Sequence, residues 1–381
     1  MLIGYHLYVL THDPLSLGWL GLGQAIPAIG LVLFGGVVAD RFNRRMLVLA
    51  CWASEGVVCL LLAATAMLGT QQAIMMLYAA GFLTGCIGAV QSPATTGLES
   101  DLVPEAGAMR SLSVLASATQ ATGLVGPVLA SILFDLITPE GAYGVLAVVL
   151  VLACLLLRLV PTPPQPRLAS HGDGVMANVR EGLSFAFNDQ VLLGSMALDL
   201  FAVFFGGATA LLPAYASDVL GIGATGFGIL RAAMPVGSLL AMLAAVRRPP
   251  NRFAGLTMHA AVAGFGIAII TFALSRNFVL SFVALALAGA CDGMSVVIRR
   301  AVLRLGTPGP MRGRIAAVRM VFVNSSNQLG DFESGMLAAA IGIVPAVWVG
   351  GVITLAVVAI TAWRAPKLLR LNLSEFSVAE G

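Results

Sequence analysis

The chain has 381 residues, of which 59% are hydrophobic and only 10% are charged, and its formal net charge is +3. Soluble domains carry about 25% charged residues, so this chain has too few charges to cover a surface in contact with water. The composition therefore predicts an integral membrane protein, and the small positive excess argues against nucleic acid as a partner.

Long apolar runs follow one another along the chain, and each can cross ~30 Å of hydrocarbon as a helix of about 20 residues. An apolar piece at 1–11 precedes them and is too short to cross. We therefore expect an all-α membrane protein. The predicted spans are 16–38, 46–68, 72–98, 107–136, 141–160, 191–217, 225–247, 253–274, 278–298, 315–341 and 344–363.

The longest break between spans is 161–190, which opens with a run rich in proline. Its second half has apolar residues at helical spacing, which favours an amphipathic helix on the membrane surface. A solvated linker is the alternative. The predicted organisation is an N-terminal half at 1–160, a cytoplasmic linker at 161–190, a C-terminal half at 191–363 and a cytoplasmic tail at 364–381.

Nearly all of the 21 Lys and Arg residues fall in alternate loops or in the tail. Arg231 lies within a span, and Arg276 lies in a loop of the opposite set. Loops rich in Lys and Arg stay on the cytoplasmic side. We therefore expect a multi-pass protein of the bacterial cytoplasmic (inner) membrane with a cytoplasmic C-terminus.

The two halves match each other at a constant offset, which predicts two six-helix halves related as parallel repeats. The same offset maps the start of the seventh helix, near Val191, to a position before Met1. We therefore expect the first helix to lack much of its N-terminal half. The matching pairs are Gly18 with Gly226, Pro27 with Pro235 and Gln120 with Gln328.

A short charged link, Gly36-Val-Val-Ala-Asp40-Arg41-Phe-Asn-Arg44-Arg45, joins the first two full spans. Its spacing resembles the loop between helices 2 and 3 of major facilitator superfamily transporters. In that superfamily the corresponding Asp latches against the start of helix 11. The resemblance implies the major facilitator fold and a gating latch formed by Gly36, Asp40, Arg41, Arg44, Arg45, Arg312 and Arg314.

Two further stretches carry the resemblance. Gly123, Gly126 and Pro127 resemble a Gly-Pro motif associated with exporters, although Ala130 replaces the last expected Gly. The run 307–335 is similar to the helix 10–11 region of the enterobactin exporter subgroup. Known relatives export catecholate siderophores, and more distant ones export macrolides or other drugs, in exchange for protons. Arg319, Gln328 and Asp331 differ from what that subgroup leads us to expect.

Ionisable side chains within spans are costly and usually functional, so they are candidates for proton coupling. Asp331 and Glu333 are two residues apart and cannot share a helical face. We expect Asp331 to titrate in a cavity, while Glu333 braces a neighbouring helix or shares the proton. Asp199 and Asp292 are second-rank proton carriers. Arg231 would be their counter-ion or an anchor for an anionic substrate.

Two further expectations concern ionisable side chains within spans. Asp292 could instead pair with Arg299 or Arg300 in a structural role. Glu55 lies nearer the cytoplasmic end and is expected to support a gate.

Polar and aromatic residues on helical faces predict a substrate cavity between the halves. Asn324, Gln328 and Asp331 share one face, and the phenylalanines of the seventh helix could stack on an aromatic substrate. Packing in the core or against lipid is the alternative for those phenylalanines. The predicted cavity residues are Gln24, Gln120, Asn324, Gln328, Phe201, Phe204 and Phe205.

These features together predict a secondary active transporter, a proton-coupled exporter (antiporter) of a small organic molecule such as a catecholate siderophore. A multidrug or macrolide efflux pump, an uptake symporter and a non-transporting membrane protein are the alternatives. The sequence offers no nucleophile–base pair and no metal-ligand pattern, so we expect neither an enzyme nor a cofactor beyond the proton gradient. The expected partners are the substrate, protons and the lipid bilayer, and the family resemblance implies a monomer.

Overall fold

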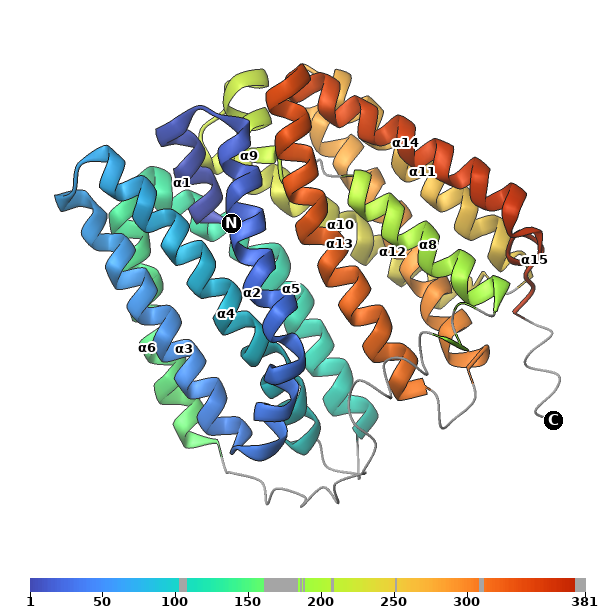
Figure 1. The fold of residues 1–381 in the computed structure, drawn as a ribbon, viewed down its shortest axis with the longest axis horizontal. Helices are drawn as coiled ribbons and strands as arrows, with labels where there is room; N and C mark the ends of the chain where they lie inside the picture. Colours follow the sequence, from blue (N-terminus) through green and yellow to red (C-terminus); the bar gives the residue numbers. More distant parts are fainter. Residues whose placement is uncertain are drawn as a thin grey trace. The chain divides into compact units, whose positions relative to one another are not determined.

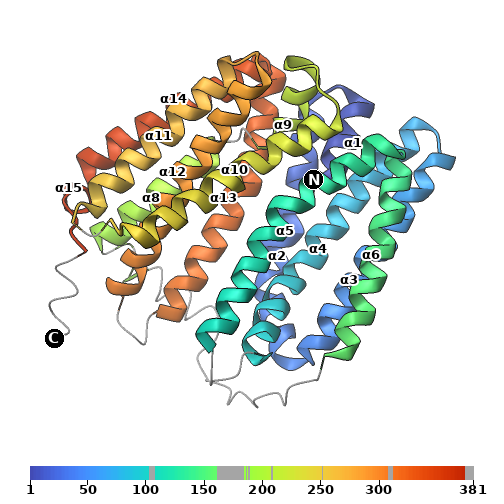
Figure 2. The same cartoon turned by 180° about the vertical axis from the view of Figure 1, so that it is seen from behind.

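A computed structural model of the chain describes residues 1–102, 108–160, 184–185, 187, 189–206, 209–250, 252–307 and 312–373. In these ranges every regular element is a helix, which confirms the all-α prediction (Figures 1 and 2). Nine of the described helices are long and apolar enough to cross a membrane. The predicted amphipathic helix at 161–190 lies almost entirely outside the described residues.

The first of two compact units comprises Met1–Gly172 together with Ile222–Gly228. Within it α2 packs on α4, and α3 packs between α4 and α6. Its helices are α1 (Leu2–Thr11), α2 (Pro14–Arg41), α3 (Arg44–Ala63), a 3-10 turn η1 (Ala64–Met67), α4 (Thr70–Leu102), α5 (Ala108–Leu136) and α6 (Pro139–Leu159).

Short polar residues begin several of these helices by accepting hydrogen bonds from free backbone N–H groups. Asn43 accepts from the N–H of Met46 at 3.2 Å, and Thr138 accepts from that of Gly141 at 3.1 Å. Pro139 then occupies the first helical position of α6, where its missing N–H costs nothing. The local sequence thus sets where the apolar helices start.

Glycine brings α2 and α4 close together. A Cβ added at Gly35 of α2 would collide with the backbone of Ala89, and one at Gly85 of α4 would come within 2.5 Å of the Gln24 carbonyl oxygen. Small residues permit such close backbone approach in membranes, where apolar side chains gain little from meeting each other.

The second unit comprises Asp173–Gly221 together with Ile229–Gly381. Within it α11 packs between α12 and α14, and α8 packs on α13 and α14. Its elements are α8 (Gln190–Phe205), α9 (Leu212–Ala214), a π-turn η2 (Tyr215–Val219), α10 (Ala224–Arg247, from Ile229 onward), α11 (Ala254–Leu274), α12 (Phe278–Leu305), α13 (Arg312–Ile341), α14 (Ile343–Arg364) and α15 (Pro366–Leu369).

The predicted span 191–217 is interrupted in the structure. Helix α8 ends at Phe205, and the chain resumes helical form at Leu212. Gly206 follows α8 and lies so close to the ring of Phe265 that a Cβ there would collide with it. Pro213 also lacks the N–H that a continuous helix needs. The break places Gly206 and Thr209 beside a cavity described below.

The chain that follows α14 packs against other helices of the second unit. The Leu368 side chain is fully buried. The Gly255 N–H donates to the carbonyl oxygen of Leu371 at 3.1 Å, and the Gln190 side chain donates to the carbonyl oxygen of Arg364 at 2.8 Å. The first part of the predicted tail therefore belongs to the packed core.

The first turn of α10 is held within the first unit. Asp135, near the end of α5, accepts from the N–H groups of Ala224 at 3.2 Å and of Thr225 at 2.6 Å. The ring of Tyr5 stacks on that of Phe227 with centroids 4.9 Å apart. A carboxylate at a helix N-terminus satisfies free N–H groups and opposes the helix dipole.

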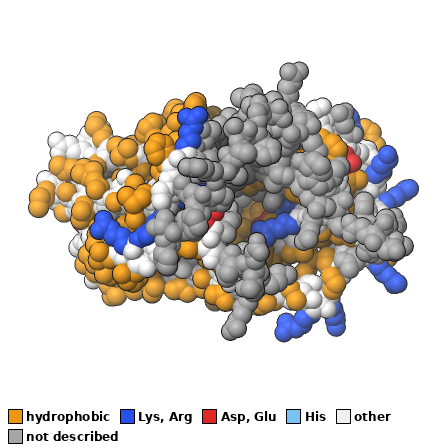
Figure 3. All heavy atoms as spheres, turned by 90° about the horizontal axis from the view of Figure 1, so that it is seen from below, with side chains coloured by type: hydrophobic (Ala, Val, Ile, Leu, Met, Phe, Trp, Pro, Cys, Tyr) orange, Lys and Arg blue, Asp and Glu red, His pale blue; other side chains and the backbone are white. Residues whose placement is uncertain are grey.

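Basic and hydrophobic side chains both reach the surface. In the view from below, Lys and Arg side chains lie at several separate places among hydrophobic side chains (Figure 3). Arg45 at the start of α3 donates to the carbonyl oxygen of Arg158 near the end of α6. Basic side chains at helix ends with apolar flanks are what a multi-pass membrane protein requires.

Candidate functional site

The buried charges of the second unit lie within helices rather than at their ends. Asp292, Ser295 and Arg299 are spaced i, i+3 and i+7, so they share one face of α12. Asp199 lies in the interior of α8, and Asp331 lies in the interior of α13. Three helices thus present ionisable groups away from their ends, and α12 is one of the nine candidate spans.

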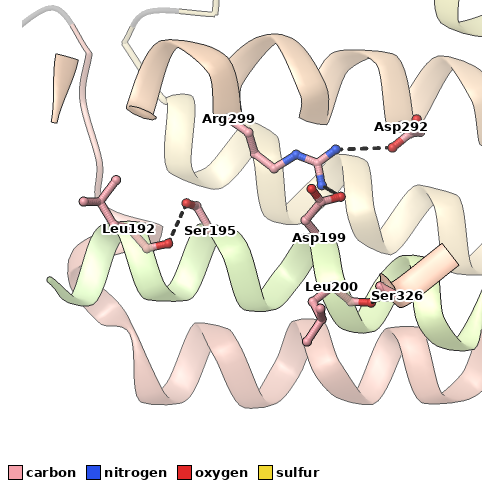
Figure 4. A network of polar contacts seen from close by, with 7 residues as sticks. All are labelled: Leu192, Ser195, Asp199, Leu200, Asp292, Arg299 and Ser326. Atoms are coloured by element: carbon pink, nitrogen blue, oxygen red, sulfur yellow. Dashed lines mark hydrogen bonds and ion pairs between the residues drawn. The ribbon is translucent and has the colours of Figure 1, made fainter. Parts of the chain in front are cut away.

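Arg299 is the centre of this charge cluster. Its guanidinium forms an ion pair with Asp199 of α8 and a second one, at 3.4 Å, with Asp292 of its own helix (Figure 4). The side chains of Arg299 and Asp199 are only 5% and 8% exposed, whereas that of Asp292 is 40% exposed. Two carboxylates therefore share one guanidinium.

This pairing corrects the predicted role of Arg231 as counter-ion of Asp199 and Asp292, because Arg299 fills it. It also realises the alternative in which Asp292 pairs with Arg299. A buried ion pair must offset a desolvation cost of several kcal/mol per ion, so removing one partner costs about 3–5 kcal/mol. Arg299 was missed as a central residue because its contact with Asp199 joins helices distant in sequence.

Close packing of α10 against α12 brings the cluster into place. A Cβ added at Gly289 of α12 would collide with the carbonyl oxygen of Met234, and one at Gly293 would come within 2.8 Å of the Ser238 backbone. Gly289 and Gly293 form a G-x-x-x-G pair, which lets two backbones approach closely. Helix α12 is therefore held close against α10 within the second unit.

A cavity of about 180 Å³ opens beside this cluster, and all its lining residues belong to the second unit. Its walls combine charged and polar groups with apolar ones, as expected of a small-molecule site. The lining residues are Asp199, Ala202, Gly206, Thr209, Met234, Val262, Phe265, Asp292, Ser295, Arg299, Asn327 and Asp331.

Two polar atoms in this wall have no hydrogen-bond partner among the described residues. They are the Ser295 hydroxyl and the Arg299 Nε, and both are buried; the Ser295 residue is 1% exposed. An unpaired buried polar group costs about 1–3 kcal/mol. A polar molecule in the cavity would satisfy such groups.

Asp331 and Glu333 lie on different faces of α13, as predicted. Asp331 lines the cavity, whereas Glu333 does not, and the Ser334 hydroxyl donates to Glu333 at 3.4 Å. Arg231 of α10 interacts electrostatically with Asp331. It forms no ion pair within 4.0 Å in the described part of the chain. Asp331 thus presents a carboxylate to the cavity with no direct partner among the described groups.

The face of α13 that lines this cavity includes Asp331, as predicted, and also Asn327, which was not predicted. Asn327 lines the cavity together with Asp331, four residues later on the same face. Gln328 does not line it, and its buried side-chain oxygen finds no partner among the described residues. The side chain of Asn324 lies outside the described part. The i, i+4 spacing was the signal that could have identified Asn327.

The other predicted cavity residues do not line this cavity. Phe204 and Phe205 meet edge to face, with centroids 4.8 Å apart, and their backbones pack against Gly330 and Gly350. Phe201 is 42% exposed. In the first unit, Gln24 is half-buried on α2 and Gln120 is exposed on α5. These residues stay predictions for a cavity formed by both halves.

The structure describes part of the predicted latch. Arg44 pairs with Asp101 of α4 at 2.8 Å and also donates to the Gly97 carbonyl oxygen at 3.3 Å. The close approach to α4 falls on Gly35, whereas a Cβ at Gly36 would meet no atom within 4 Å. Arg41 is exposed. The side chains that would form the latch itself, those of Asp40, Arg312 and Arg314, lie outside the described part.

The predicted Gly-Pro motif lies within α5. Pro127 is inside the helix, and its carbonyl oxygen accepts from the Ser131 hydroxyl at 2.8 Å. A Cβ at Gly123 or Gly126 would meet no atom within 4 Å. Gly228 of α10 packs on this turn, where a Cβ would collide with Ser131.

Glu55 forms a separate polar contact in the first unit. With its amide nitrogen facing Glu55, Gln91 donates to the carboxylate at 2.8 Å and accepts from the Trp52 ring nitrogen at 3.2 Å. This amide orientation is assigned from the hydrogen-bond network. Glu55 therefore has a neutral partner and is a useful reference for the acids of the cavity.

The family model described as Major Facilitator Superfamily matches residues 2–326. The enterobactin exporter EntS of Shigella boydii serotype 4 (strain Sb227) is 25% identical over 342 residues, covering 88% of this chain and 78% of its own. EntS of Escherichia coli O1:K1 / APEC is 25% identical over 338 residues with the same coverage.

Solved transporter structures share the fold. A mutant of the nucleoside transporter NupG has a TM-score of 0.75 at 11% identity, covering 95% of this chain and 94% of its own. The D-xylose–proton symporter has a TM-score of 0.70 at 15% identity, covering 98% and 97%. At these identities the likeness concerns the fold alone.

Proposed function

Because this chain belongs to the major facilitator superfamily and is a multi-pass transporter, we propose that it is a proton-coupled exporter of a small organic molecule. It would work by alternating access in a bacterial inner membrane, with its C-terminus in the cytoplasm. The observation that carries the proposal is the cavity shared by Asp331 and the Asp199–Arg299–Asp292 cluster.

Asp331 is the proposed proton-binding group. It faces the cavity without a direct ion-pair partner among the described residues, so its charge depends on what occupies the cavity. Asp292 shares its guanidinium with Asp199 and is the more exposed of the two, which makes it the second candidate. Glu333 lies on another face of α13 and is assigned a supporting role.

Coupling follows if protonation and cargo binding each favour a different state of the transporter. A ligand shifts such an equilibrium only by its difference in affinity for the two states. Protonation of Asp331 removes a negative charge from the cavity. Cargo that interacts with the ionised carboxylate favours release of that proton. Exchange of protons for cargo is the expected result.

Similarity and chemistry support different cargoes. The EntS relatives are named for enterobactin, which makes a catecholate siderophore the first candidate. The apolar cavity wall formed by Ala202, Met234, Val262 and Phe265 would also suit a broad drug efflux pump.

The test is secretion of enterobactin by a bacterium that lacks its own exporter and expresses this chain. The proposal expects restored secretion with the wild type, loss with Asp331→Asn and retention with Glu140→Gln, which changes an acid in the first turn of α6 in the first unit. Amounts of membrane-inserted protein are matched between variants. Secretion unchanged by Asp331→Asn would refute the proton-binding role. No secretion by any form would remove the siderophore and leave drug efflux to be screened.

A further inference from the structure

Charge in the cavity of the second unit is unbalanced. Its wall contains three carboxylates, those of Asp199, Asp292 and Asp331, against the single guanidinium of Arg299. That guanidinium is already shared by Asp199 and Asp292. Two negative charges are therefore in excess when all groups are ionised. Arg231 acts on Asp331 from outside the cavity wall and leaves one in excess.

We propose that this cavity binds the protonated amine of an organic cation, with Asp331 as its counter-ion. The inference rests on the proposed function, because it treats the cavity as a cargo site, and it names the cargo's chemical class. A cation would restore neutrality, whereas a carboxylate or catecholate anion would add to the excess charge. Within a low-dielectric interior such differences count for far more than in water.

A second observation, independent of the acids, points to a polar ligand. The Ser295 hydroxyl lines the cavity, is 1% exposed and has no hydrogen-bond partner among the described residues. A hydroxyl oxygen accepts hydrogen bonds, and an ammonium group offers three N–H donors. Asn327 and Thr209 add further side-chain oxygens to the same wall.

The apolar part of the wall suits an aromatic or aliphatic body attached to the amine. Phe265 belongs to it, and an aromatic ring face attracts cations. An engineered cavity of about 150 Å³ accommodates benzene. The 180 Å³ here therefore holds one ring with a short aminomethyl arm.

The unpartnered Nε of Arg299 is the feature that could attract an anion instead. It is buried at a guanidinium that two carboxylates already engage, so an anion would have to compete with both. It would also lie beside Asp331. Catechol is a different competitor, because its neutral hydroxyls can donate to carboxylates without adding charge.

The test is calorimetric titration of the purified full chain in detergent at pH 7 with four one-ring probes. Benzylamine is a cation, benzyl alcohol and catechol are neutral, and benzoate is an anion. The proposal expects benzylamine to bind at least tenfold more tightly than the other three. If catechol binds as tightly as benzylamine, or if benzylamine does not bind at all, the proposal is overturned.

Three variants identify the groups responsible. Asp331→Asn should weaken benzylamine at least tenfold and leave benzyl alcohol unchanged, whereas general damage to the fold would weaken both. Ser295→Ala should weaken benzylamine severalfold without changing the charge of the wall. Glu55→Gln, which removes an acid outside the cavity, should change neither. Equal losses for benzylamine and benzyl alcohol in Asp331→Asn would contradict the assignment.

Binding at equilibrium requires no proton gradient, so the two proposals can fail separately. Benzylamine binding without proton-dependent efflux of any cargo tested, benzylamine included, would overturn the exporter and keep the amine site. If enterobactin secretion depends on protons and catechol binds more tightly than benzylamine, the exporter proposal stands and the proposal of an amine site is overturned.

Discussion

The two units use similar helices but place their charges differently. In the first unit, Arg44 and Asp101 pair where α3 begins and α4 ends. In the second unit, Asp199, Asp292 and Arg299 lie in the interior of their helices, around a cavity. A charge at a helix end lies near water and costs little, whereas one within a span is costly and usually functional. Pairing at the helix ends therefore indicates support of the fold, and the interior cluster indicates transport.

The largest effect is expected from Arg299→Met, which leaves the buried carboxylate of Asp199 and the half-buried one of Asp292 without their guanidinium. Breaking a buried ion pair costs about 3–5 kcal/mol, so we expect a strong drop in thermal stability in detergent together with loss of transport. Thermal unfolding and secretion are the measurements.

A matched control separates stability from transport. The triple variant Asp199→Asn, Asp292→Asn, Arg299→Met removes all three charges and should recover most of the stability. It should not recover proton-dependent transport. A triple variant that transports like the wild type would show that the cluster is only structural.

The next effect concerns the close packing that holds the charged face of α12 in place. Gly289→Ala places a methyl group against the Met234 carbonyl oxygen, and overpacking of this kind costs about 1–3 kcal/mol. Gly88→Ala in α4 is the control, because its Cβ would meet no atom within 4 Å. Thermal unfolding of the two variants should differ clearly. Equal unfolding temperatures would show that α10 and α12 do not pack through Gly289.

The smallest effect is expected at the helix ends of the first unit. Asp101→Asn removes the charge that Arg44 contacts but keeps an oxygen that can accept its hydrogen bond. We expect a loss of about 1 kcal/mol, measured by thermal unfolding, with transport reduced far less than in Arg299→Met. If Asp101→Asn abolished transport while the protein stayed folded, the distinction between the units would be wrong.

Apolar length predicted nine of the eleven spans, whereas α8 and α13, at the other two, are helices that do not meet the length and hydropathy of a candidate span in the described part of the chain. It did not predict the break of 191–217 after Phe205, which follows from the contact of Gly206 with Phe265 and from Pro213. Helical periodicity cannot reveal a contact with a distant ring. Gly206 was the residue that could have indicated the break, because glycine destabilises a helix.

The site was predicted in part. Asp331, Asp199 and Asp292 were identified from the cost of charge in a membrane, and all three line one cavity. The counter-ion was misassigned to Arg231 because spacing along one helix cannot show which arginine reaches a neighbouring helix. Ser295 carried no signal of its own, since a serine in a membrane helix usually bonds its own backbone.

The most direct test of the account is proton-driven accumulation of cargo, measured with enterobactin and with benzylamine, by proteoliposomes containing the purified chain. The wild type should concentrate the cargo when a proton gradient is imposed. At cargo concentrations that saturate the variant, Asp331→Asn should still exchange labelled for unlabelled cargo but should not concentrate it, because exchange needs no proton and accumulation does. Accumulation by Asp331→Asn at the wild-type level would contradict the claim that this carboxylate couples protons to transport.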